Sequence, residues 1–95
     1  MQVSESEFEL IRIFEDLSTL ARYAIYKILE EKRELKAYDL VEELRKMNVT
    51  TSYSAILQHL RKMQTNSGLV EVFEKDGKIH VKLKKKVKIE VEDVG

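Results

Sequence analysis

Residues 52–66 carry the side-chain types that read the edges of DNA bases. Ile56, Leu60 and Met63 recur at helical spacing and predict one buried stripe. The opposite face of this predicted helix then carries Tyr53, Ser54, Gln58, Arg61 and Lys62. A glutamine can bridge N6 and N7 of adenine, a serine can donate or accept, and arginine and lysine suit phosphates. We therefore expect this face to bind the major groove of DNA; the alternative is an ordinary amphipathic helix with a polar exterior.

The residues that lead into this helix are also suited to an anion. Thr50, Thr51 and Ser52 are each competent N-caps, and their hydroxyls could donate to a phosphate at the helix N-terminus. Leu57 stands where a DNA-facing residue would be polar. It either contacts a thymine methyl group or is buried by a slightly rotated helix.

A β-hairpin should follow directly. Beyond Gly68 the apolar period changes from 3.6 to 2, which predicts strands over 69–74 and 78–84. Asp76-Gly77 is a two-residue hairpin signal, because both turn positions favour positive φ. Centring the turn there gives the pairs Lys75 with Lys78, Glu74 with Ile79, Phe73 with His80, Val72 with Val81, Glu71 with Lys82 and Val70 with Leu83. Lys75 and Lys78 at the tip are either DNA contacts or ordinary solvated lysines; Lys82 is a weaker candidate opposite Glu71.

Three further helices are predicted upstream, over 4–16, 19–32 and 37–47. The first begins with a capping box at Ser4 and Glu7 or at Ser6 and Glu9. The second has Leu20, Tyr23, Ala24 and Ile28 on its buried stripe, with Ile25 and Leu29 beside it. The third has Leu40, Val41, Leu44 and Met47 inward, and Asn48 supplies a left-handed stop. In the tail, 87–95, Val87, Ile89 and Val91 alternate and predict a strand that is added to this sheet or to a partner subunit.

This order of elements predicts one α+β domain over 1–95, mainly α with a small β wing: a winged helix-turn-helix. The first helix carries more apolar residues than a peripheral helix needs for its own core. One of its stripes is therefore a candidate homodimer interface, formed by Phe8, Leu10, Ile11 and Phe14.

Composition excludes several function classes. The 95 residues contain no cysteine, so a disulfide framework, a thiolate metal site and a cysteine nucleophile are excluded. His59 and His80 lie in different elements without ligand spacing, and we expect them to be structural, His59 against the third helix and His80 beside Phe73. We expect no enzyme, no cofactor and no metal. The acidic N-terminus and the lack of a long apolar run predict a cytoplasmic protein that is not membrane-bound.

Net charge hides an asymmetry. The chain has 17 basic and 17 acidic residues, but residues 45–88 alone hold 11 basic and 3 acidic ones, net +8. Residues 1–44 hold 6 basic and 11 acidic ones. The neutral total is thus a cancellation, and the predicted recognition helix and wing form the basic half.

Two segments resemble the ArsR type of small winged-helix transcriptional repressor, over roughly residues 14–84. Residues 17–29, LSTLARYAIYKIL, are similar to that family's LADPTRLRILELL helix and retain Arg22. Residues 52–63, SYSAILQHLRKM, are similar to its recognition-helix signature SQSTVSHHLKVL, and Gly68-Leu69-Val70 stands at its entry into the wing.

The departures limit what the resemblance implies. One extra residue lies between Leu60 and Gly68, Leu20 replaces the family's proline, and the cysteine-containing metal site and the C-terminal dimerisation helix are missing. Metal sensing is therefore not implied. Small winged-helix proteins of this kind are frequent in archaea and their viruses, and the charged, cysteine-free composition, typical of heat-adapted proteins, suits such a source.

Together these features predict a homodimeric, sequence-specific regulator of transcription that binds double-stranded DNA. The alternative from another class is a winged-helix adaptor that binds proteins and not DNA.

Overall fold

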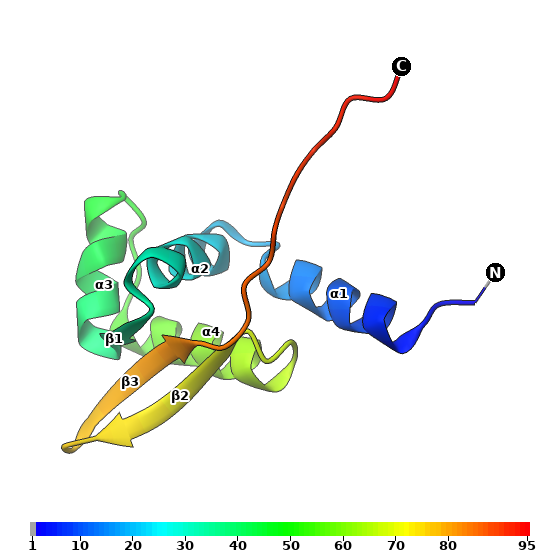
Figure 1. Cartoon of the computed structure of the whole chain (residues 1–95). Helices are drawn as coiled ribbons and strands as arrows, with labels where there is room; N and C mark the ends of the chain where they lie inside the picture. The colour runs from blue at the N-terminus through cyan, green and yellow to red at the C-terminus, as the bar shows by residue number, and fades with distance from the viewer. Residues whose placement is uncertain (1) are drawn as a thin grey trace.

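The amphipathic segments fold into helices packed on a small sheet. The computed structural model describes residues 2–95, and these form four helices and one three-stranded antiparallel sheet (Figure 1). The elements are α1 (Glu5–Asp16), α2 (Leu20–Lys32), β1 (Glu34–Lys36), α3 (Ala37–Lys46), α4 (Tyr53–Thr65), β2 (Val70–Lys75) and β3 (Lys78–Leu83). All four predicted helices and both hairpin strands are present, and each of their ends lies within one residue of the prediction.

Local capping explains where α1 begins and where α3 ends. Of the two possible capping boxes, Ser4 and Glu7 form the real one: the Ser4 hydroxyl accepts from the Glu7 N–H, and the Glu7 carboxylate accepts from the Ser4 N–H. These hydrogen bonds lower the pKa of Glu7 below its usual value. Asn48 has φ 61° after α3, which confirms the predicted left-handed stop.

The sheet has the order β1-β3-β2, so β3 is its central strand. All six predicted pairs between β2 and β3 are confirmed, from Val70 opposite Leu83 to Lys75 opposite Lys78. Asp76 and Gly77 have φ 53° and 74°, as the predicted two-residue turn requires. Strand β1 was not predicted; it pairs with β3 through Glu34 with Lys82, Leu35 with Val81 and Lys36 with His80.

The core lies between the helices and one face of the sheet. Ile25, Leu29, Leu40, Leu44, Ile56, Leu60, Met63 and Val81 are fully buried in it. Each such side chain contributes about 1.5–3 kcal/mol on leaving water. The predicted stripe of the second helix is partly wrong: Leu20 is 72% exposed and Tyr23 is 39% exposed, whereas Tyr26 is buried. The predicted inward position of Met47 is wrong as well, because Met47 follows the last turn of α3 and is 48% exposed. Helix α2 is apolar on most of its circumference, so its periodicity does not define a single inward face.

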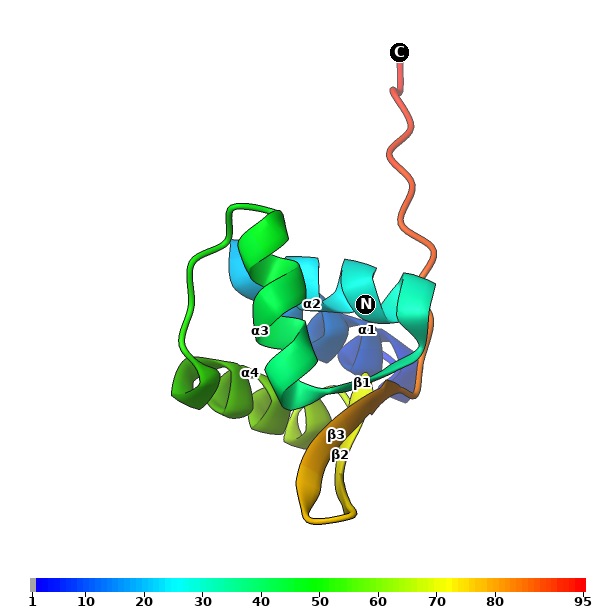
Figure 2. The same cartoon turned by 90° about the vertical axis from the view of Figure 1, so that its left-hand side faces the viewer.

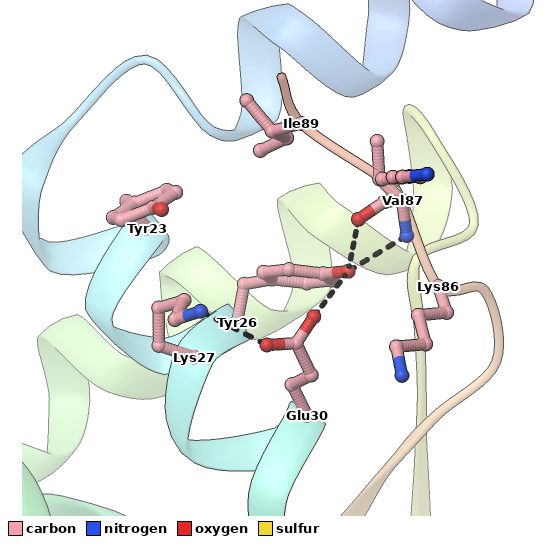
Figure 3. A pocket seen from close by; sticks show the side chains of 8 residues that line it. Tyr23, Tyr26, Lys27, Glu30, Lys86, Val87 and Ile89 are labelled. Atoms are coloured by element: carbon pink, nitrogen blue, oxygen red, sulfur yellow. Dashed lines mark hydrogen bonds and ion pairs between the residues drawn. The ribbon is translucent and has the colours of Figure 1, made fainter. Parts of the chain in front are cut away.

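The tail also differs from the prediction, because residues 84–95 form no strand in the described part of the chain. Both edges of β3 are already occupied, and the backbone after it turns away as the Lys84 N–H donates to the Leu69 carbonyl (2.8 Å). Val87 is then held by the Tyr26 hydroxyl, which accepts from the Val87 N–H at 2.7 Å and donates to its carbonyl at 3.1 Å (Figure 3). Burial raises the pKa of Tyr26, so the phenol stays protonated and able to donate.

Candidate nucleic-acid interface

Helix α4 presents the predicted polar face to solvent. The Ser52 hydroxyl accepts from the Ala55 N–H (3.1 Å) and caps the helix. Ile56, Leu60 and Met63 are fully buried, as predicted, and this fixes the rotation of the helix. Four predicted DNA-contacting side chains are exposed along the outer face as a result: Ser54, Gln58, Arg61 and Lys62.

The loop before α4 differs from the prediction in how the helix is capped. Ser52 alone caps the helix, whereas the Thr51 hydroxyl makes only a long contact of 3.5 Å to the Ser52 carbonyl. Thr50 is exposed and Thr51 is half-buried, so the hydroxyl of Thr50 remains open to solvent. Leu57 is half-buried and packs against the core. This favours burial of Leu57 by the rotation of the helix over contact with a thymine methyl group.

An aromatic pair joins α3 to the start of α4. Tyr53 is half-buried and stacks on Tyr38, with ring centroids 4.4 Å apart and planes at 19°. Tyr38 nevertheless stays 69% exposed. Sequence reasoning missed Tyr38, since the pair is made by the tertiary approach of two helices and no local spacing signals it.

The hairpin tip brings two cations together. Lys75 and Lys78 face each other across the Asp76-Gly77 turn and are both exposed. Lys82 is engaged further along the hairpin: its ammonium lies 3.6 Å from the Glu71 carboxylate and 5.6 Å from the centre of the Phe73 ring. This is the pairing that made Lys82 a weaker candidate for DNA contact.

Ion pairing separates two groups of cations. Lys27, Lys32, Arg45 and Lys46, on α2 and α3, each have a carboxylate partner. By contrast, Arg61, Lys62, Lys75 and Lys78 form no ion pair with any carboxylate of residues 2–95. Arg61, Lys62, Lys75 and Lys78 thus place unpaired positive charge on α4 and the hairpin tip, where it is available to a polyanion. The other exposed cations without an ion pair in residues 2–95 are Arg12, Arg33, Lys36, Lys84 and Lys86.

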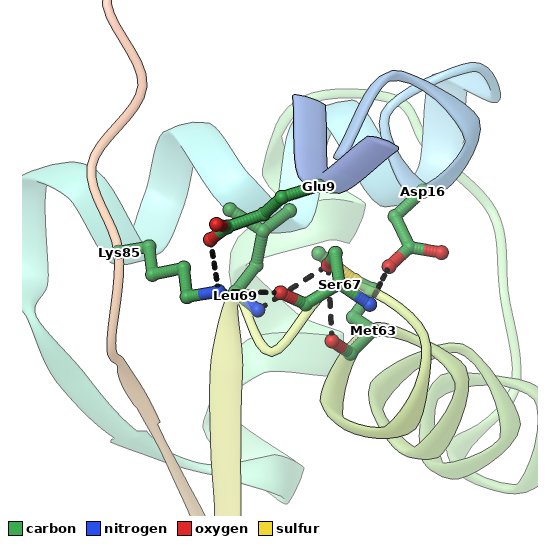
Figure 4. Close-up of polar contacts among 6 residues, drawn as sticks. All are labelled: Glu9, Asp16, Met63, Ser67, Leu69 and Lys85. Carbon is green, nitrogen blue, oxygen red and sulfur yellow. Dashed lines mark hydrogen bonds and ion pairs between the residues drawn. The ribbon is translucent and has the colours of Figure 1, made fainter. Parts of the chain in front are cut away.

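The lysines after β3 are less available. Lys85 lies 2.6 Å from the Glu9 carboxylate and donates to the Ser67 carbonyl (2.9 Å; Figure 4). The hydrogen bond and the charge of Lys85 lower the pKa of Glu9. Lys88 lies 3.3 Å from the Glu90 carboxylate. Of the four lysines after β3, Lys84 and Lys86 have no ion pair with residues 2–95.

The two histidines have structural surroundings. His80 stacks on Phe73 with centroids 5.5 Å apart, as predicted. The polar contact of His59 is with Arg22 of α2, at 3.4 Å, and not with helix 37–47. Burial, and next the charges of Arg22 and Lys62, lower the pKa of His59, so its ring is neutral near pH 7.

Arg22 links this histidine to the end of α1. Its guanidinium donates to the carbonyls of Asp16 (2.7 Å) and Glu15 (3.2 Å), two of the orphan acceptors at that helix terminus. The Asp16 carboxylate in turn accepts from the Ser67 N–H (3.1 Å; Figure 4), just after α4. It also accepts from the Asn66 amide (3.0 Å). Helix α1 is thereby tied to the base of the candidate interface.

The candidate dimer residues lie exposed on α1. Phe8, Leu10, Ile11 and Phe14 are 41–53% exposed, and Ile13 is the buried apolar residue of the helix. In Figure 1, α1 lies on the opposite side of the molecule from α3. A contiguous apolar face of this kind on a helix is typical of a protein contact.

Among residues 2–95, no group of three or more His, Cys, Asp or Glu side chains is placed to hold a metal ion, and no helix is long and apolar enough to cross a membrane. Comparison with family models, curated proteins and solved structures finds no match to this chain.

Proposed function

We propose that the chain is a winged helix-turn-helix protein that binds double-stranded DNA and regulates transcription in the cytoplasm. Helix α3, the turn after it and α4 correspond to the helix-turn-helix, and the β2–β3 hairpin to the wing. Helix α4 enters the major groove, and the hairpin reaches the DNA backbone or the adjacent minor groove.

The distribution of unpaired cations carries this proposal. Arg61 and Lys62 on α4, and Lys75 and Lys78 at the hairpin tip, have no carboxylate partner in residues 2–95, while the exposed cations of α3 do. The contrast is between neighbouring helices: α3 carries Glu42 and Glu43 as partners for its cations, whereas α4 contains no acidic residue. Cations left unpaired on α4 can neutralise the phosphates of DNA, which then releases its condensed counterions. Binding to DNA therefore accounts for the lack of carboxylate partners on α4.

Salt-dependent binding tests the proposal. Fluorescence anisotropy with a random-sequence duplex is measured at two salt concentrations, and an operator is selected from a random library. Lys75→Ala weakens binding to every duplex and lowers the salt slope by about one unit. Lys46→Ala is the matched control, because Lys46 is exposed but ion-paired with Glu43 on α3; its slope should equal that of the wild type. A wild type that binds no duplex at low salt refutes the proposal and favours the protein-binding adaptor.

Base readout requires a separate comparison. Gln58→Ala and Ser54→Ala should lose about 1–3 kcal/mol of discrimination between the selected operator and random DNA. Equal loss of operator and random-site binding would show that these side chains do not read bases.

We propose further that the protein is a homodimer joined through the exposed face of α1. A two-fold dimer would read two half-sites about one helical turn apart. Ile11→Glu should shift the mass in sedimentation equilibrium from dimer to monomer. Met47→Glu is the matched control at the C-cap of α3, since Met47 is 48% exposed and Ile11 is 47% exposed. A monomeric wild type, or dissociation by both variants alike, contradicts this interface.

A further inference from the structure

A groove lies between the N-terminal ends of α3 and α4 and the tip of the hairpin. It has a volume of about 460 Å³ and is lined by Lys36, Tyr38, Asp39, Tyr53, Gly77 and Lys78, among others. In Figure 2 these three parts of the fold lie along the lower side of the molecule. Residues from four separate elements thus meet around one space beside the proposed recognition helix.

The aromatic wall of this groove is ordered but open. Tyr53 supports the ring of Tyr38 by stacking at 4.4 Å, and Tyr38 remains 69% exposed. No hydrogen bond to another group of residues 2–95 occupies the Tyr38 hydroxyl. A stacked phenol with a free hydroxyl donor is suited to a phosphate oxygen, one of the common side-chain contacts to DNA backbones.

The charges around the groove favour an anion. Lys36 and Lys78 are exposed and form no ion pair with the carboxylates of the described chain. Asp39 opposes them with a single negative charge, so the lining has a net positive charge. Lys36 belongs to β1, the strand that sequence reasoning did not predict, which is why its side chain was not among the expected contacts.

We infer that this groove holds the sugar-phosphate backbone of one DNA strand, the strand that divides the major groove from the minor groove. The inference rests on the proposed function. A duplex that receives α4 in one groove and the hairpin in the next must place that backbone between the two elements. The groove occupies this interval: Lys36 and Lys78 neutralise phosphates, and the Tyr38 hydroxyl donates to a phosphate oxygen.

Three substitutions test the inference in the full-length protein by duplex anisotropy. Lys36→Gln lowers the salt slope by about one unit, because one phosphate contact is lost. Tyr38→Phe keeps the stack and weakens binding roughly 3- to 10-fold, as expected for one hydrogen bond. Asp39→Asn tightens binding, because it removes the one repulsive charge of the lining. All three act equally on operator and random DNA, since backbone contacts carry no direct sequence information.

Controls separate this inference from the proposed function. Tyr23→Phe removes the hydroxyl of an exposed tyrosine on α2, outside the groove, and should bind as the wild type does. If Lys75→Ala weakens binding while Lys36→Gln and Tyr38→Phe leave both affinity and slope unchanged, the proposed function stands and the backbone groove is refuted. If Tyr38→Ala weakens binding but Tyr38→Phe does not, the tyrosine only supports α4, and the phosphate contact is refuted. If the wild type binds no duplex, both the proposed function and the backbone groove are refuted.

Discussion

Replacement of Asp16 should show how strongly α1 is tied to the rest of the protein. Its carboxylate is fully buried, and its two oxygens accept from the Ser67 N–H and the Asn66 amide. In Asp16→Ala the Ser67 N–H loses its acceptor in a buried position, at a cost of about 1–3 kcal/mol. Asn66 keeps a second acceptor, the Arg12 carbonyl at 3.2 Å, so its loss is nearer 1 kcal/mol. The free energy of unfolding should fall by about 2–4 kcal/mol.

For a domain of this size, a loss of that order lowers Tm by roughly 10–30 °C. Urea unfolding followed by circular dichroism measures the change, and Asp16→Asn, which keeps one acceptor oxygen, should lose about half as much. Glu15→Ala is the control, because Glu15 is the exposed neighbour and should change stability by less than about 0.5 kcal/mol. If Asp16→Ala is no less stable than Glu15→Ala, the buried carboxylate does not hold α1 in place.

Two further predictions concern His59 and Arg33. The pKa of His59 is lowered below 6.5, so as the pH falls from about 7.5 to about 5 the unfolded chain takes up a proton that the folded chain does not, and stability falls. The urea midpoint should therefore depend less on pH across this range in His59→Gln than in the wild type, and His80→Gln should keep the wild-type dependence. Arg33 has φ 70° and ψ −47° at the end of α2, a conformation that favours glycine. Arg33→Gly should therefore raise stability by about 1 kcal/mol in the same assay, and an equal gain in Arg33→Ala would place the effect in the side chain instead of the backbone.

The elements that could be predicted are those specified by local signals. The hairpin register followed from an Asp-Gly turn flanked by alternating residues, because a one-residue slip would turn Val70 and Val81 away from the core. Strand β1 could not be predicted in this way. Its three residues have no period of their own, and it exists because Leu35 meets Val81, more than forty positions along the chain.

In the tail the local pattern predicts a strand that does not form, because no edge of β3 is free to pair with it. Val87, Ile89 and Val91 alternate like a strand, but β1 already pairs with the edge of β3 that faces away from β2. The Tyr26 hydroxyl satisfies the backbone of Val87 instead. The addition of residues 87–95 to a partner subunit stays a prediction, and the exposed side chains of Ile89 and Val91 are what such a pairing would bury.

The candidate interface could be predicted as a face but not as a set of contacts. Sequence counts placed a net charge of +8 in residues 45–88. Pairing in the fold then redistributes this charge: Arg45, Lys46, Lys82, Lys85 and Lys88 belong to the same segment, yet each has a carboxylate partner. Lys36 lies outside the segment and has none in residues 2–95. Because only unpaired cations release counterions without first breaking an ion pair, the salt slope should follow the unpaired set and not the sequence count.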